Sequence, residues 1–304
     1  MRVTMSMLSE RVRSNLIAAS DQLLRAQNMA TTGKRISTPS DDPIGTGKSL
    51  SLRSALASID QYSRNIDVAE SQLTVTSAAL DSVVNSIQQL RTFALSAASG
   101  AKTPEALANL AVQIEQVGKT LANTGNTLHM GKYIFSGSLS NTQPIIENGA
   151  GTPPYIYQGD SNQLTIRIGP GSSVPASVTG DAVFNMGSVS VPGAPDIFTT
   201  IQNLRDAVLA GNVTAMSAEL RNIDKNLSNA ISINSLVGEK LRRLDLSSDG
   251  LADSKLNVSE LLSKNEDADM AEALVALRVR ENVYQAAIST AGRLLDMTLA
   301  DFLQ

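Results

Sequence analysis

An unbroken seven-residue repeat is the feature of this 304-residue chain that most constrains its fold. Seven apolar residues recur at heptad spacing, and each has a companion three residues later, of which one, Thr76, is polar. The two series are Leu52, Ile59, Ile66, Leu73, Leu80, Ile87 and Ala94, with Ala55, Tyr62, Ala69, Thr76, Val83, Leu90 and Ala97. Such a seam predicts a long helix packed against other helices. Asp42-Pro43 supplies an N-terminal cap and Gly100 a stop, which predicts a length on the order of 80 Å at ~1.5 Å per residue.

Two further apolar stripes are expected to pack with this helix. One repeats every seven residues: Met216, Ile223, Ala230, Val237, Leu244, Leu251 and Val258. The other belongs to a shorter amphipathic helix opened by Thr103-Pro104-Glu105 and comprises Leu107, Leu110, Ile114, Val117, Leu121 and Leu128. Aromatic residues make up only 3% of the chain, so its core must consist mainly of aliphatic side chains, which suits helix-on-helix packing. We therefore expect a discontinuous helical rod domain formed by residues 43–137 and 198–265.

The middle of the chain breaks this periodicity with frequent glycine and proline. Short β-prone runs lie between them, at residues 133–135, 155–157 and 164–168. The segment Gly159-Asp160-Ser161-Asn162 is expected to be the turn of a hairpin that joins the second and third runs. The sequence thus predicts a mainly α fold with a small β-domain, residues 138–197, inserted between helices that run antiparallel.

Both ends of the chain carry an apolar stripe that needs a partner. The N-terminal stripe comprises Leu8, Val12, Leu16, Ala19, Leu23, Ala26 and Ala30, and Gly33 is expected to end its helix. The C-terminal stripe comprises Met270, Leu274, Leu277, Glu281, Tyr284, Ile288, Ala291, Leu295, Thr298 and Phe302. We interpret residues 1–42 and 266–304 as assembly helices, and these two stripes as an axial assembly interface.

Charge favours pairing between the two ends. Residues 1–36 hold six basic and two acidic side chains, whereas residues 266–304 hold three basic and seven acidic ones. This opposite balance favours contact between N- and C-terminal segments, within one subunit or between subunits. An isolated helix of this kind is marginal in water, so we expect both ends to be mobile in the free monomer and ordered on assembly.

The inventory of reactive side chains argues against catalysis. The chain has no cysteine and one histidine, His129, which leaves no thiolate chemistry, no Ser/His/Asp triad and no His-rich metal site. The pairs Asp41-Asp42 and Asp267/Asp269 lie at expected helix starts, where capping is the simpler role. A net charge of −4 and the lack of a long apolar run argue against nucleic acid and membranes. We expect no enzyme activity, no cofactor and no metal.

The residues at both ends resemble the bacterial flagellin superfamily. The N-terminal part of the resemblance lies in residues 30–43 and rests on Gly33, Arg35, Ser40, Asp41, Asp42 and Pro43. The C-terminal part lies in residues 266–272 and 281–287. Within the superfamily the chain resembles the hook-filament junction family of flagellar hook-associated protein 3, through residues 131–137, 157–160 and 301–303. Tyr133, Phe135, Gly137, Gly159 and Asp160 carry that narrower resemblance, whereas residues 296–300 depart from the expected Ser-Leu-Leu.

The resemblance implies a fold and a set of partners. The terminal helices would form an inner coiled-coil layer, with the rod domain outside it and the β-domain outermost. The partners would be flagellin, the first junction protein (hook-associated protein 1), copies of this chain in a ring, and a cytoplasmic export chaperone on the C-terminal helix. The subunit would be exported without a cleaved signal peptide by the flagellar type III apparatus and would lie outside the cell.

Two alternatives remain open from the sequence. The chain could be a flagellin, the filament subunit, which would polymerise indefinitely instead of forming a limited ring. Without the resemblance, it could be a coiled-coil scaffold or a type III secretion translocator. A translocator would need a strongly apolar membrane-active segment, which the sequence lacks.

Overall fold

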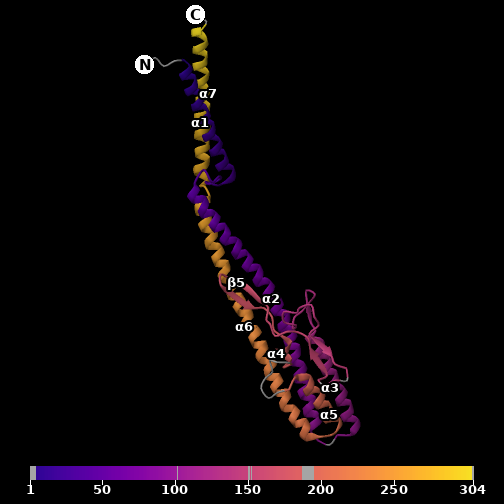
Figure 1. Ribbon diagram of the computed structural model, residues 1–304. Coiled ribbons are helices and arrows are strands. Elements are labelled where there is room, and N and C mark those ends of the chain that lie inside the picture. The colour runs from indigo at the N-terminus through magenta and orange to yellow at the C-terminus, as the bar shows by residue number, and fades with distance from the viewer. Residues whose placement is uncertain (1–4, 101, 150, 152, 187–194, 303–304) are drawn as a thin grey trace. The chain divides into compact units, whose positions relative to one another are not determined.

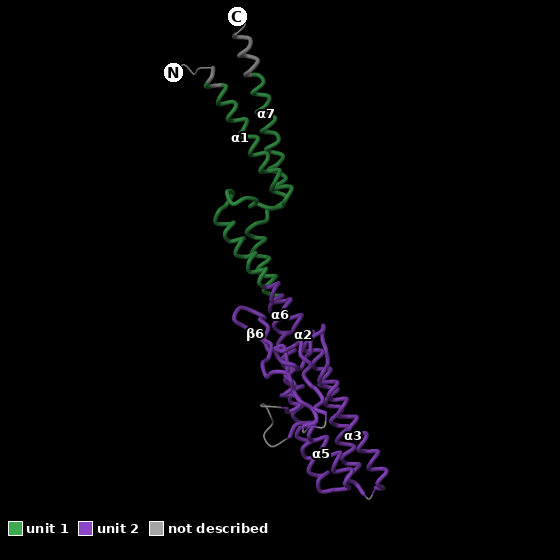
Figure 2. The backbone as a smooth tube through the Cα atoms, turned by 45° about the vertical axis from the view of Figure 1, so that its right-hand side comes forward, with its two compact units in different colours: residues 1–58, 253–304 green, residues 59–252 purple. Residues whose placement is uncertain are grey.

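The computed structural model describes residues 5–302 apart from 101, 150, 152 and 187–194, and the side chains of residue 7 and residues 9–293 within that range. Three residues of the expected assembly interface, Leu8, Leu295 and Phe302, therefore lie outside the described side chains. The chain forms two compact units, shown in Figure 2. Unit 1 consists of residues 1–58 and 253–304, and unit 2 consists of residues 59–252.

The predicted heptad helix is α2 (Pro43–Ala98). Its first turn is capped by Asp42, whose Oδ1 accepts a 2.8 Å hydrogen bond from the amide of Gly45. Every seam position from Ile66 to Ala97 is buried in unit 2. Thr76 is fully buried there. Burial of its hydroxyl is tolerated because the hydroxyl donates to the carbonyl of Gln72 at 2.8 Å and needs no partner from another helix.

The second seam lies on α6 (Val213–Glu266). Met216, Ile223, Ala230, Val237 and Leu244 are all buried. Arg91 of α2 pairs with Asp224 at 2.7 Å, and Asp81 of α2 accepts from Asn234 at 2.7 Å. These contacts run in opposite directions along the two helices, so α2 and α6 are antiparallel in unit 2, as expected.

Two shorter helices complete the helical core of unit 2. Helix α3 (Pro104–Gly125) is capped by Thr103 and buries Ile114 and Leu121. It ends at Gly125, so the expectation that Leu128 continues its stripe is wrong, and that side chain is exposed in a strand. Helix α5 (Ile197–Leu209), capped by Asp196, packs against α3 and was not expected as a separate helix.

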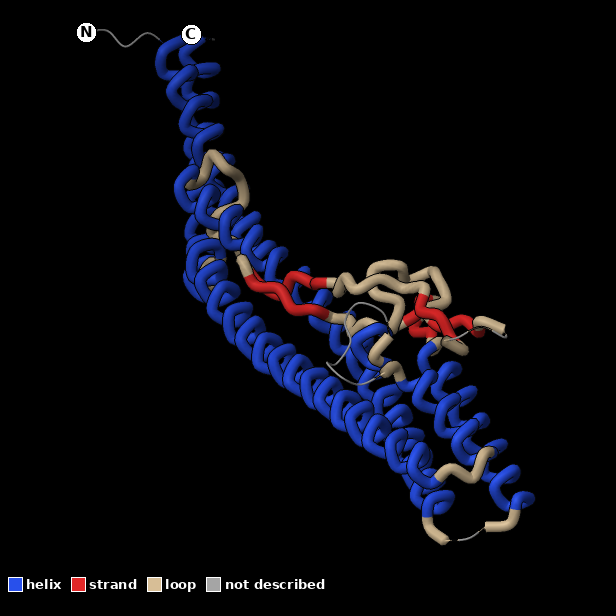
Figure 3. Tube along the Cα trace, turned by 60° about the horizontal axis from the view of Figure 1, so that its bottom comes forward, coloured by secondary structure: helices blue, strands red, loops and turns tan. Residues whose placement is uncertain are grey.

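Among the described residues, the strands of unit 2 pair in three two-stranded antiparallel sheets. Figure 3 shows the strands in red. They are β1 (Leu128–His129) with β2 (Lys132–Tyr133), β3 (Ile145–Glu147) with β4 (Tyr155–Tyr157), and β5 (Thr165–Gly169) with β6 (Ser172–Pro175). The short helix α4 (Gly180–Phe184) follows.

The predicted hairpin between residues 155–157 and 164–168 is wrong. Residues 155–157 pair with 145–147, and the third run pairs with 172–175 across a tight turn at Gly171, whose φ is +74°. Residues 159–162 do not close a hairpin because Asp160 is held by another segment: its amide donates to Ser136 O at 3.2 Å, and its carboxylate accepts from the amide of Ser138 at 2.6 Å.

Aromatic rings join the β-segment to the helices of unit 2. Phe184 contacts Phe135 with ring centroids 5.9 Å apart and Phe198 of α5 with centroids 5.7 Å apart. Tyr155 of β4 packs on Phe198 at 4.6 Å. Four of the ten large rings of the chain thus meet where strands and helices pack together, and the mainly α fold with a β insertion is confirmed.

Unit 1 contains α1 (Met5–Thr32), α7 (Met270–Phe302), the first turns of α2 and the last turns of α6. Helices α1 and α7 lie side by side (Figure 1). Gly33, with a φ of +68°, ends α1 as predicted. Across the part of the chain that the structure describes, no helix is both long and apolar enough for a membrane span.

Candidate functional site

The paired terminal helices of unit 1 are the first element of the candidate site. On α1, Val12, Leu16 and Leu23 are half-buried and Ala26 is buried. Among the described side chains of α7, Ala273 is the most buried, and Leu277 and Tyr284 are half-buried. A 2.6 Å hydrogen bond from Arg280 Nη1 to Gln22 Oε1 joins the two helices. The expected pairing of the two ends therefore occurs within one chain.

Much of the apolar surface of α7 stays uncovered by α1. Met270, Leu274 and Ile288 of the expected interface are exposed, and so are three valines that sequence reasoning did not select, Val275, Val279 and Val283. The valines follow one another at four-residue spacing, so they form one stripe, which we call the valine stripe. The four-residue spacing of the valines could have identified the stripe from the sequence. However, α7 carries apolar residues on several faces, so the heptad pattern does not show which face meets α1.

The second element is a strap between the two interhelical links of unit 1, formed by residues 33–36 and 265–268. The amide of Arg35 donates to Glu266 O at 2.7 Å, and the amide of Ala268 donates to Gly33 O at 2.9 Å. The strap therefore fixes where α1 ends relative to where α7 begins. Asn265 extends it to α2, because its Nδ2 donates at 2.8 Å both to Gly45 O and to Ser49 Oγ.

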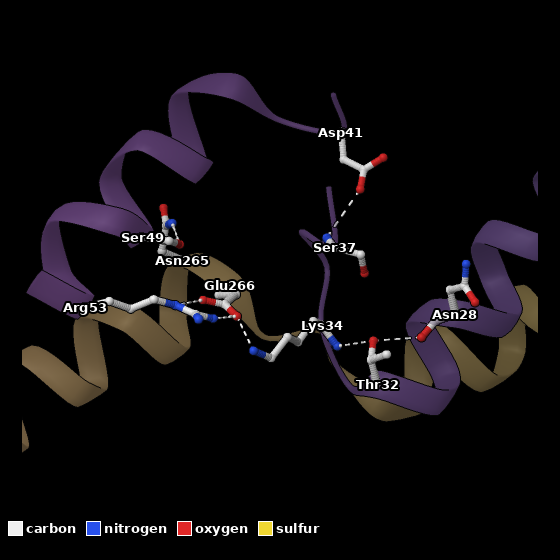
Figure 4. A network of polar contacts seen from close by, with 9 residues as sticks. All are labelled: Asn28, Thr32, Lys34, Ser37, Asp41, Ser49, Arg53, Asn265 and Glu266. Carbon is white, nitrogen blue, oxygen red and sulfur yellow. Dashed lines mark hydrogen bonds and ion pairs between the residues drawn. The ribbon is translucent and has the colours of Figure 1, made fainter. Parts of the chain in front are cut away.

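The carboxylate of Glu266 is the electrostatic centre of the strap (Figure 4). The residue is only 4% exposed, and it forms ion pairs with Lys34 and with Arg53, whose Nη2 lies 2.5 Å from Glu266 Oε1. Hydrogen bonding to Lys34, followed by the contact with Arg53, lowers the pKa of this carboxyl from its ordinary value. A buried carboxylate is stable only when it is paired in this way.

The acidic residues of the N-terminal motif shape the link before α2. Asp41 Oδ2 accepts from the amides of Thr38 at 2.8 Å and Ser37 at 3.3 Å, and the Thr38 amide bond is the main cause that lowers its pKa. Arg35 lies 3.5 Å from Asp42, which also caps α2. Asp41 thus holds a turn, and Asp42 holds the helix start.

The remaining acidic pair lies at the second link. Asp269 caps α7 through a 2.8 Å bond from the amide of Ala271, whereas Asp267 forms a backbone bridge with Lys34. Within the described residues, no three acidic, histidine or cysteine side chains converge in a way that could hold a metal ion.

In unit 2 the structure brings together four of the five residues of the narrower resemblance. Tyr157, beside Gly159, donates its hydroxyl proton to Phe135 O at 2.8 Å or to Asp160 O at 3.0 Å, and burial raises its pKa. Gly137 has a φ of +70°, and a Cβ there would lie 2.1 Å from Asp160 Oδ1. These residues form a packed knot, and Tyr133 of β2 borders it, because its carbonyl accepts a 3.1 Å hydrogen bond from Ser136 Oγ.

Comparisons with known proteins match both ends of the chain and nearly all of its length. Residues 3–140 match the family model of the bacterial flagellin N-terminal helical region. Flagellar hook-associated protein 3 of Salmonella typhimurium is 24% identical over 98% of this chain and 98% of its own. A flagellin of Halalkalibacterium halodurans is 21% identical over 86% of this chain and 84% of its own. The flagellar junction protein FlgL of Legionella pneumophila superposes with a TM-score of 0.60 at 20% identity, covering 73% of this chain and 100% of that structure.

Proposed function

We propose that this chain, a member of the flagellar hook-associated protein 3 family, is a structural subunit at the hook-filament junction of the bacterial flagellum. In this role it connects the hook side of the flagellum to the flagellin filament. Its contribution is mechanical rather than catalytic, and it acts outside the cell as a flagellar component.

The single observation that carries this proposal is the uncovered apolar surface of the paired helices α1 and α7. Ile17 and Leu24 of α1 are exposed together with Leu274, Ile288 and the valine stripe of α7. Exposed apolar side chains in this number on one helix pair indicate contact sites, since burial contributes about 25 cal/mol per Å² of apolar area. Neighbouring subunits in an axial assembly supply that burial.

The neighbours follow from the position in the flagellum. Hook-associated protein 1 contacts the subunit on the hook side, other copies of the chain surround it in a ring, and flagellin contacts it on the filament side. Before export, a cytoplasmic chaperone covers α7, because this apolar helix would otherwise aggregate in the cell. Export through the flagellar type III apparatus is supported by the lack of cysteine, since a chain that is threaded unfolded benefits from having no thiols to crosslink.

A flagellin is the second candidate, supported by the match to the Halalkalibacterium halodurans protein. The fuller coverage by hook-associated protein 3 and the knot around Asp160 favour the junction role. The two roles differ in a measurable way, because a flagellin polymerises without limit whereas a junction subunit forms an assembly of fixed size.

Deletion of the gene in its native cell tests the proposal. We expect hooks without filaments, with flagellin released into the medium, and restoration of filaments by the gene in trans. Deleted cells that keep both hooks and filaments would overturn the proposal. Loss of flagellin itself from the culture, rather than its release, would favour the flagellin role.

A further inference from the structure

A cavity of about 350 Å³ opens in unit 1 beside the strap, within the range of about 300–1,000 Å³ that is usual for ligand sites. Its lining comes from the end of α1, from the link between α1 and α2, from the first turns of α2 and from Glu266. All of these segments belong to unit 1, so the cavity is formed within one compact unit.

The charged side chains that line this cavity carry one positive charge in excess. Among the described residues they are Lys34, Arg53 and Glu266, and both cations pair with the one carboxylate. Arg53 directs two of its five N–H groups at Glu266, and Lys34 directs one of its three. The side chains of Lys34 and Arg53 remain 41% and 52% exposed, so donors of both stay available to a second acidic group.

Two hydroxyl groups lie on the same face of α2 as Arg53. Thr46, Ser49 and Arg53 all line the cavity and follow one another at three- and four-residue spacing, which aligns them along the helix. Ser49 is only 6% exposed, and its Oγ accepts a 2.8 Å hydrogen bond from Asn265 Nδ2, so its own proton remains available to a ligand. Thr46 Oγ1 is buried and has no hydrogen-bond partner among the residues that the structure describes. Such buried polar atoms are rare, and a bound water or ion is a common explanation for them.

We propose that this cavity binds a small tetrahedral oxyanion, inorganic phosphate or sulfate. The oxygens of the ion accept from Lys34 and Arg53 and from the hydroxyls of Thr46 and Ser49. An anion with acceptors pointing in several directions matches a site with excess positive charge and donors on more than one element. The bound ion connects Lys34 to the first turns of α2 and so adds a contact beside the strap. The inference concerns unit 1 alone and goes beyond the proposed role at the junction.

Titration of the purified, isotope-labelled full-length chain with sodium phosphate near neutral pH tests this site by NMR. The amide resonances of Lys34 and Ser49 should shift and saturate with a Kd in the low millimolar range or tighter. Sodium chloride at the same ionic strength should shift neither resonance. A parallel titration with sodium sulfate compares the two ions, and a response to one of them alone identifies that ion as the ligand.

Two variants remove donors from the site in different ways. Arg53→Gln cancels the excess charge and should weaken phosphate binding roughly tenfold. Thr46→Val removes a hydroxyl while it keeps the charge and shape of the site, and should weaken binding about threefold or more. The matched control is Lys48→Gln, which removes one exposed cation of α2 that does not line the cavity and should leave the affinity unchanged.

The Thr46→Val variant also covers the case in which Arg53→Gln fails to fold. Because the hydroxyl of Thr46 has no partner among the described residues, this variant should keep the unfolding midpoint of wild type in chloride.

Three outcomes would overturn the inference. They are no saturable shift with either ion, equal shifts with phosphate and chloride, and phosphate affinities of Arg53→Gln and Thr46→Val equal to that of wild type. Failure of this site leaves the proposed function untouched, because that function is tested separately by the gene deletion.

Discussion

Arg53 and Glu266 form an ion pair at 2.5 Å although 213 residues separate them in the sequence. One residue lies on the first turns of α2 and the other ends α6, so their contact joins these two helices within unit 1. Through Lys34, which pairs with the same carboxylate, the contact reaches the end of α1. One buried acid thus adds its ion pairs to the backbone bonds that hold the strap.

Replacement Glu266→Gln should loosen the strap without unfolding unit 2. The variant keeps an acceptor oxygen but loses the charge-assisted bonds to two half-exposed cations. We expect this loss to lower the free energy of opening the strap by about 1–2 kcal/mol. Hydrogen exchange at the amides of Arg35 and Ala268, which donate across the strap, should then be roughly 5–30 times faster. Glu260→Gln, which breaks an exposed pair with Lys264, is the control and should leave both amides unchanged. Equal exchange in wild type and Glu266→Gln would contradict the role of the strap.

Acid should weaken the same contact. Hydrogen bonds from Lys34 and then Arg53 lower the pKa of Glu266 from 4.5, so in the window below 4.5 the unfolded chain binds more protons than the folded one. The contribution of Glu266 to the free energy of unfolding is therefore complete above that pH and is lost as the pH falls through the folded pKa. Urea titrations between pH ~6 and pH ~3 should show wild type and Glu266→Gln converging towards low pH. If the difference in free energy of unfolding between wild type and Glu266→Gln stays constant over this pH range, the lowered pKa of Glu266 is contradicted.

Gly137→Ala should destabilise unit 2. The positive φ strains any side chain, and the added Cβ would meet Asp160, so we expect a loss of about 2 kcal/mol or more in the free energy of unfolding. Gly238→Ala is the matched control, because that glycine lies inside α6 with open space around it and should gain up to ~1 kcal/mol. If urea titrations give Gly137→Ala and wild type the same free energy of unfolding, the close packing of Gly137 against Asp160 is contradicted.

Limited proteolysis of the purified monomer should remove the terminal helices first. Where α1 and α7 pack together, the fully buried side chains are small and the larger ones are only half-buried. Helices α2, α3, α5 and α6, in contrast, share a continuous core. The strap sharpens the expected boundaries, since cleavage should stop near Gly33 and Ala268 rather than enter α2 or α6. Protease resistance of α1 in a confirmed monomer would contradict the expectation that the helix pair is ordered only on assembly.

The sequence predicted the long helices well because their burial repeats along one element. Positions Ile66 to Ala97 of the heptad are buried without exception, and the caps at Asp42, Gly33 and Thr103 are local signals. Helix α5 was missed because it directly follows a stretch rich in glycine and proline. The hairpin was wrong because the partner of Tyr155–Tyr157 lies before it, beyond a loop, where no local pattern marks it.

The candidate site was harder to predict, for a different physical reason. An ion pair such as that of Arg53 and Glu266 produces no repeating pattern in the sequence, because each residue is one charged side chain among many. The faces of α7 were ambiguous as well: a helix with valines and leucines on several faces satisfies more than one heptad. Only its packing against α1 shows that Ala273 is covered and that the valine stripe is free.

Complementation of the gene deletion with Val279→Asp plus Val283→Asp tests the central claim, that the uncovered face of the terminal helix pair mediates assembly. Both valines are exposed, so the purified variant should keep the helix content and unfolding midpoint of wild type. Cells that carry it should form hooks but no filaments, whereas cells with Val112→Asp, an exposed valine of α3, should be fully flagellated. Normal filaments in the Val279→Asp, Val283→Asp cells would contradict the claim.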